Sequence, residues 1–147
     1  MTIAPLDAAD LPALLDLYRE LLPVENSLVR SEEIYRQMAE NPDYLLLGAK
    51  QDGVLLGSVL GICCHCLAFR GQPFLVVEDV IVREASRGQN VGRRLMEALD
   101  DFATKRDCAY CILVSAGHRT QAHTFYEKLG FTEDVRGFRK FYDAAGQ

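Results

Sequence analysis

The hydrophobic positions of this chain follow a helical period in some segments and form short apolar runs in others. Leucines and a tyrosine between positions 11 and 22 recur every three or four residues after Asp10, which predicts a first helix with Asp10 as its N-cap. A second apolar helical face predicts a helix that begins at Ser31 and ends at the Asn41-Pro42 boundary. The first third of the chain is therefore predicted to be helical.

Short apolar runs dominate the middle of the chain. Residues 44–50 and 54–67 are strand-like, and Gln51-Asp52-Gly53 between them is typical of a hairpin turn. A third strand, an amphipathic helix and a fourth strand follow, and this order predicts a parallel, right-handed crossover. In sequence, the later elements are the strand 74–82, the helix from Val91 to Ala103, the strand 109–115, a helix at 121–129 ended by Gly130, and one or two strands within 131–142.

Composition limits the classes of protein to consider. The 147 residues suit a single domain over 1–147, with 49% hydrophobic and 25% charged residues. A net charge of −5 argues against a nucleic-acid partner. Residues 1–10 lack a basic, apolar leader, and no window approaches the ~20 apolar residues of a membrane span. We therefore expect a cytoplasmic protein with no membrane partner.

Five cysteines lie in strand-like apolar runs. Their odd number is a poor basis for disulfides, so we expect reduced thiols that pack as small apolar groups. A zinc site built from the Cys63-Cys64-His65-Cys66 run and the Cys-x-x-Cys at 108–111 is the alternative. Strand alternation places Cys64 and Cys66 on one face and Cys63 and His65 on the other, so one ion cannot easily collect them. We expect no metal.

The segment 74–96 combines an apolar strand, two adjacent acids, an Arg/Gly loop and a helix. Unpaired N–H groups and the positive dipole at a helix start suit a polyphosphate, and the flanking cations Arg87, Arg93 and Arg94 strengthen that interpretation. No GK[ST] follows the glycines, which excludes a nucleoside-triphosphate P-loop. The pattern is not GxGxxG, and the next strand ends at Ser115 without an acid, which excludes a dinucleotide fold.

The loop Arg87-Gly88-Gln89-Asn90-Val91-Gly92 resembles the acyl-CoA-binding motif [RQ]xxGx[GA] of GCN5-related N-acetyltransferases, the GNAT family. Asn90 stands where the family usually has glycine, and asparagine tolerates the left-handed conformation well. The order of elements also resembles this family over nearly the whole chain. The resemblance implies an α/β (α+β) fold with a mixed, central, twisted sheet flanked by helices, and acetyl-CoA as co-substrate.

Residues 122–131 are similar to the second signature of the family, AxxFYxxxGF. Transfer of an acetyl group to an amine requires a base for the amine proton and an acid for the thiolate leaving group. By resemblance, Tyr126 is the acid and Glu78 the base, with Asp79 as second choice. The resemblance also implies these cofactor-binding residues: Val80, Ile81, Val82, Arg87, Gly88, Gln89, Asn90, Val91, Gly92, Arg93, Ser115, Arg119 and Tyr126. Arg119 departs from the asparagine that many members carry there.

These features together predict an acetyl-CoA-dependent N-acetyltransferase. The acceptor implied by the resemblance is a primary amine of a small molecule, such as an amino-sugar phosphate, an aminophosphonate, a polyamine or an amino acid. Three alternatives stay open: a protein or peptide N-acetyltransferase, a non-catalytic CoA-binding module, and a zinc-stabilised interaction domain. A homodimer also stays open, since acceptor identity and oligomeric state depend on the least patterned parts of the chain.

Overall fold

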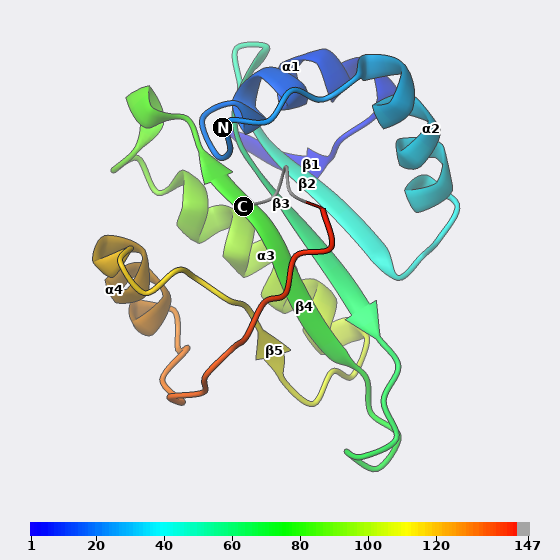
Figure 1. Cartoon of the computed structure of the whole chain (residues 1–147), viewed down its shortest axis with the longest axis vertical. Helices are drawn as coiled ribbons and strands as arrows, with labels where there is room; N and C mark the ends of the chain where they lie inside the picture. The colour runs from blue at the N-terminus through cyan, green and yellow to red at the C-terminus, as the bar shows by residue number, and fades with distance from the viewer. Residues whose placement is uncertain (144–147) are drawn as a thin grey trace. The chain divides into compact units, whose positions relative to one another are not determined.

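The protein is represented by a computed structural model, drawn in Figure 1, in which residues 1–143 are described. Two units are described separately, residues 1–112 and the described part of the second unit, residues 113–143. The first unit contains a five-stranded sheet in the order β1-β2-β3-β4-β5. Neighbouring strands are antiparallel from β1 to β4, and β4 pairs with β5 in parallel, which confirms the predicted mixed sheet. The strands are β1 (Thr2–Pro5), β2 (Tyr44–Gln51), β3 (Val54–Cys64), β4 (Phe74–Val82) and β5 (Cys111–Ile112).

Helices α1 (Leu11–Tyr18) and α2 (Leu28–Ala39) cover one face of this sheet. The apolar side of α1 packs against Leu55 of β3 and Ile81 of β4, and Tyr35 of α2 borders the same cluster. The Tyr35 hydroxyl donates a hydrogen bond to the Leu6 carbonyl at 2.9 Å. This bond ties α2 to the chain that follows β1.

Helix α3 (Val91–Lys105) packs on the opposite face and lies behind the strands in Figure 1. Its buried residues are Val91, Leu95, Met96 and Leu99; the sequence predicts three of them, whereas Met96 was not predicted and the predicted Phe102 and Ala103 are only partly buried. Glycines of β3 allow this close packing: a Cβ at Gly57 would lie 2.9 Å from Val91 Cγ1, and one at Gly61 would lie 2.7 Å from Leu99 Cδ2. The start of α3 is therefore held directly against β3.

Several predicted boundaries need correction. A short 3-10 turn, Ala8–Asp10, precedes α1; Asp7 caps it, and α1 ends at Tyr18, which leaves Leu22 exposed. Helix α2 begins at Leu28 and not at Ser31, because the Ser27 hydroxyl accepts the first-turn bond from the Arg30 N–H. Leu28 and Val29 in the first turn of α2 are exposed, so this turn does not continue the apolar face from which the helix was predicted.

The strands also differ from prediction. β1 is an edge strand that the sequence analysis did not predict. β3 ends at Cys64 and not at Leu67, whose side chain is 94% exposed. β5 contains only two residues instead of the predicted 109–115. A second 3-10 turn, Glu84–Ser86, connects β4 to the loop before α3.

The second unit contains α4 (Thr120–Lys128), close to the predicted 121–129. Gly130 has the expected left-handed backbone, with φ of 96°. The predicted strands within 131–142 are wrong: no strand forms between Leu113 and Asp143, the described part of this unit. Phe138 and Tyr142 are 89% and 92% exposed, so the weak alternation of apolar residues within 131–142 does not produce a buried face.

Candidate active site

A β-bulge in β4 sets the geometry of the two adjacent acids. Leu60 of β3 faces Glu78, but Ser58 faces Ile81, so β4 holds one extra residue between these pairs. Asp79 lies in the bulge with a left-handed backbone, φ 54°. Such a conformation is uncommon outside glycine, although Asp and Asn adopt it most readily. The bulge therefore re-aims the side chains at this point of the strand.

Alternation along β4 would place Asp79 on the same face as Leu75, which packs near Leu99 of α3. Because of the bulge, Asp79 instead lines a cavity together with residues of α1 and α2 on the other face. Its carboxyl group is half-buried, and this burial raises the pKa of Asp79 above its ordinary value. Glu78 is exposed. Of the two acids, Asp79 thus lines this cavity in a partly desolvated position.

The cavity has a volume of about 440 Å³. Tyr18 of α1 shares it with Asp79, and burial together with the nearby Asp79 charge raises the pKa of the Tyr18 hydroxyl. Tyr18 was not among the predicted site residues, because a tyrosine on the apolar stripe of a helix is read as core. The bulge that brings Asp79 toward it has no sequence signal of its own.

Contacts at the end of β4 hold α1 in place beside the cavity. The Arg83 side chain donates to the Leu55 carbonyl at 3.2 Å and forms ion pairs with Asp16 and Glu20 at 3.5 and 3.4 Å. The Glu20 carboxylate also accepts a 2.9 Å hydrogen bond from the Glu84 N–H. The wall that α1 provides is therefore anchored to the strand that carries Asp79.

Within the first unit, the other edge of β4 has no strand partner beyond its first residues. Within residues 1–112, β4 pairs with β5 only through Leu75 and Val76. The Arg83 N–H points to β3, where it bonds to the Leu56 carbonyl. With the two-residue period of a strand, the Ile81 N–H then faces β3 and the Val82 N–H faces the unpaired edge, whereas Val80 lies in the bulge, where this alternation is interrupted. The Val82 N–H at this edge can therefore donate to an extended polar chain.

The loop from Arg87 to Asn90 leads into the start of α3. Gly88 and Asn90 both have left-handed backbones, with φ of 80° and 61°. Asn90 thus has the left-handed backbone that was expected at the position where the family usually has glycine. No side chain caps α3, and its first turn contains no acid. The first N–H groups of α3 are therefore positioned for an anion.

The arginines around this helix start differ in their partners. Arg93 pairs with Glu97 at 3.7 Å between exposed side chains, and Arg94 donates to the Met1 carbonyl at 2.8 Å. Among residues 1–143, the Arg87 guanidinium makes no ion pair. Arg87 is consequently the cation most available to an incoming phosphate, and the exposed Arg93–Glu97 pair is weak enough to exchange.

The second unit holds the remaining predicted residues. Tyr126 of α4 is 8% exposed and packs between the rings of Phe125 and Phe131, with centroids 5.2 and 6.0 Å away. Burial raises the pKa of Tyr126, and the positive charge of Arg119 at the start of α4 opposes this shift. The Ser115 hydroxyl is buried and has no hydrogen-bond partner among the described residues.

Comparison with known proteins decides the family. The sequence profile described as the acetyltransferase (GNAT) family matches residues 11–131. The chain belongs to this family. An N-acetyltransferase of Bacillus subtilis (strain 168), YhfO, itself uncharacterized, is 25% identical over 129 residues, which cover 88% of this chain and 86% of that protein. GNAT proteins use acetyl-CoA as the acetyl donor.

Solved structures agree with the GNAT assignment. A structure assigned as an acetyltransferase from Agrobacterium tumefaciens str. C58 has a TM-score of 0.89 at 25% identity, covering 96% of this chain and 99% of that one. Glucosamine-6-phosphate N-acetyltransferase from Arabidopsis thaliana has a TM-score of 0.87 at 20% identity, covering 97% and 98%. The predicted GNAT fold is thereby confirmed.

The cysteines have no disulfide or metal arrangement in the part of the chain described. All five are free, and no group of three metal-ligating side chains gathers among residues 1–143. The Cys63 and Cys108 sulfurs lie 4.0 Å apart. In the same residues, no helix is long and apolar enough to cross a membrane.

Proposed function

We propose that this GNAT protein transfers an acetyl group from acetyl-CoA to the primary amine of a small molecule, with residues 1–147 acting as one domain. The observation that carries the proposal is the bulge at Asp79, because of which a partly desolvated carboxyl group lines a cavity. The same strand continues into the loop that leads to the uncapped start of α3. A cytoplasmic location stays a prediction from the sequence.

The residues present fit acetyl-CoA. The uncapped start of α3 and the Arg87 side chain would hold the pyrophosphate, and the left-handed Gly88 and Asn90 shape the loop around it. The N–H groups of Val80 and Val82 would bind the pantetheine amides. The Ser115 hydroxyl supplies a further polar group, which has no hydrogen-bond partner among residues 1–143. When bound, acetyl-CoA supplies the thioester from which the acetyl group is transferred.

Asp79 is the base in this proposal, ahead of Glu78. A carboxylate in the cavity attracts the ammonium form of the acceptor and accepts its proton, directly or through a water. The raised pKa of Asp79 makes it a stronger base than an exposed aspartate. The Tyr18 hydroxyl, whose pKa is also raised, remains protonated and can donate a hydrogen bond in the same cavity.

Tyr126 is the proposed acid for the departing thiolate. Its raised pKa keeps the hydroxyl protonated across the neutral range, and the Arg119 charge limits the cost of a transient phenolate. This role rests on the FYEKLGF segment and on the chemistry of a buried tyrosine.

The test compares Asp79→Asn with Glu78→Gln in a thiol-release assay over a panel of primary amines. We expect the Asp79 variant to lose about 10²–10⁴-fold in kcat and to lose the acid limb of the pH profile, with acetyl-CoA affinity retained in calorimetry. The Glu78 variant should stay near wild type. The opposite ranking would transfer the role of base to Glu78, and no thiol release with any amine would favour a CoA-binding module.

A further inference from the structure

The cavity that contains Asp79 has an apolar wall. Its volume of about 440 Å³ lies within the range of small-molecule sites, roughly 300–1,000 Å³. Side chains from α1, α2, the loop between these helices and the sheet line it, and nine of the fifteen lining residues are apolar or aromatic. The apolar and aromatic lining residues are Leu11, Leu14, Leu15, Tyr18, Ile34, Tyr35, Met38, Leu46 and Leu60.

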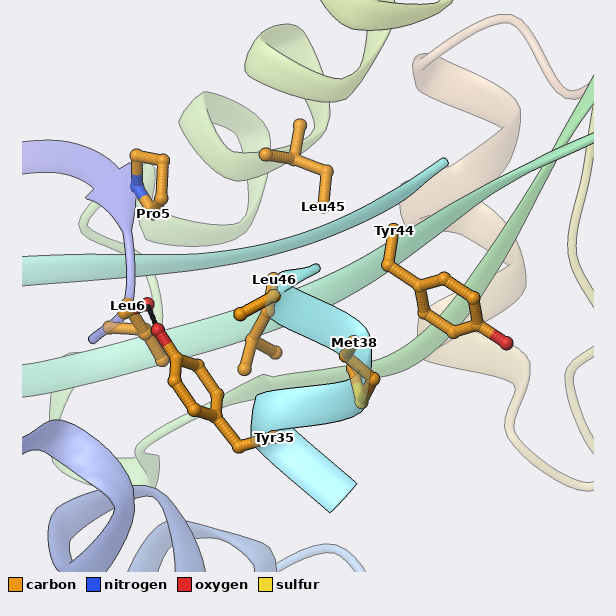
Figure 2. Close-up of a pocket in the computed structure, with 8 residues that line it drawn as sticks. Pro5, Leu6, Tyr35, Met38, Tyr44, Leu45 and Leu46 are labelled. Atoms are coloured by element: carbon orange, nitrogen blue, oxygen red, sulfur yellow. Dashed lines mark hydrogen bonds between the residues drawn. The ribbon is translucent and has the colours of Figure 1, made fainter. Parts of the chain in front are cut away.

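One part of this wall is fixed by a hydrogen bond. The Tyr35 hydroxyl is bonded to the Leu6 carbonyl, as the dashed line in Figure 2 shows, so this tyrosine presents its ring to the cavity and not its polar end. Tyr35 and Met38 also line a smaller neighbouring cavity of about 200 Å³, drawn in Figure 2. Tyr35 thus adds apolar surface without adding a free hydroxyl.

The charged side chains at the rim are already paired. Arg30 is the one cation that lines the cavity in the described chain, and its guanidinium pairs with Glu33 at 3.0 Å. Glu25 pairs with Arg19 at 3.5 Å. The hydroxyl of Ser31, another rim residue, donates to the Ser27 carbonyl at 2.8 Å. Because Arg30 is the cation of this lining and already has Glu33 as its partner, a phosphate or carboxylate group on the acceptor would have to compete with Glu33 for it.

We propose that the acceptor is a small primary amine carried on an alkyl or aryl body, with its ammonium group at Asp79 and its apolar body between α1 and α2. This inference rests on the proposed function and narrows it. The hydroxyl groups of an amino sugar would give up their hydrogen bonds to water on binding and would meet leucine side chains instead. Each hydroxyl group left without a partner would weaken binding. A polyamine would bring a second ammonium group into the same apolar space.

The test measures kcat/KM by thiol release at saturating acetyl-CoA for propylamine, hexylamine, 2-phenylethylamine, spermidine, glucosamine 6-phosphate and the dipeptide Ala-Ala. The two alkylamines have nearly equal ammonium basicity, so their ratio isolates apolar burial. Each buried methylene should raise kcat/KM about threefold to fourfold, which gives hexylamine an advantage over propylamine of roughly 30- to 60-fold. Hexylamine and 2-phenylethylamine should also exceed the polar amines.

A matched pair of variants on α2 locates the effect. Ile34→Thr places a hydroxyl on the cavity wall and should lower the ratio of hexylamine to propylamine at least threefold. Val29→Thr makes a similar change on the same helix at a side chain that is 67% exposed and outside the lining, and should leave the ratio unchanged. Calorimetric titration with hexylamine, without acetyl-CoA, should show the same ranking of the two variants.

Failure of this inference is distinct from failure of the proposed function. Robust turnover of glucosamine 6-phosphate, spermidine or Ala-Ala with no gain from propylamine to hexylamine would overturn the acceptor class and leave the acetyltransferase intact. Absence of thiol release with every amine would overturn the proposed function and the acceptor class with it. Equal ratios in the two α2 variants would remove the cavity from acceptor binding.

Discussion

Gly57 should be a position where a single methyl group disturbs both stability and acetyl-CoA binding. A Cβ at Gly57 would lie 2.8 Å from the Ile81 carbonyl oxygen and 2.9 Å from Val91 Cγ1. The carbonyl is backbone and cannot rotate away, so β4 must move just after its bulge, and the Val91 side chain at the first residue of α3 must also be displaced. Overpacking of this kind costs about 1–3 kcal/mol.

For a chain of this length, 1 kcal/mol corresponds to roughly 2–4 °C in Tm. We therefore expect Gly57→Ala to lower Tm by about 2–12 °C in a thermal melt. Calorimetry below the transition should show weaker acetyl-CoA binding, because the displaced Val91 begins the helix whose N–H groups are proposed to hold the pyrophosphate.

Two other glycines provide controls. Gly117 has no heavy atom within 4 Å of an added Cβ, so Gly117→Ala should change stability by no more than about 0.5 kcal/mol. At Gly61 the nearest atom is the end of the Leu99 side chain, which can shift, so Gly61→Ala should fall between the two. A Gly57→Ala protein that melts and binds acetyl-CoA like Gly117→Ala would refute the reasoning.

Three further predictions concern the loop, the proposed acid and the cysteines. Gly92→Asp should weaken acetyl-CoA binding in calorimetry, because it adds a negative charge in the first turn of α3; an unchanged Kd in a folded variant would remove the loop from the cofactor site. Tyr126→Phe should lower kcat about 10²–10⁴-fold with little change in Tm. It should also abolish the alkaline limb of the pH–rate profile, which lies at a higher pH than an ordinary tyrosine would give because the pKa of Tyr126 is raised. Turnover near wild type would show that Tyr126 is only a packing residue. A chelator should leave Tm unchanged, whereas a fall of more than about 5 °C would indicate structural metal and overturn the interpretation of the cysteines as packing residues.

Local chemistry in the sequence was enough to predict much of the fold. The hairpin at Gln51-Asp52-Gly53 forms as expected, with left-handed backbones at Asp52 and Gly53. Asn90 and Gly130 also adopt the predicted left-handed conformation. These features follow from backbone sterics at single residues, so they need no information from distant parts of the chain.

Element ends were less predictable, because competing caps look alike in sequence. Ser27 and Ser31 are equivalent candidates for the start of α2, and the bond from the Arg30 N–H to Ser27 decides between them. The apolar residues at 131–142 resemble a strand, but a strand needs a paired neighbour and a buried face, and Phe138 and Tyr142 are exposed.

The sequence by itself therefore predicted the family, the order of the crossover elements and the pair of acids. Only the tertiary structure decided which acid lines the cavity. Strict alternation would place Asp79 on the α3 face beside Leu75, and the extra residue in β4 turns it to the α1 and α2 face beside Tyr18. A bulge depends on the register between two strands, and no spacing within one strand specifies it.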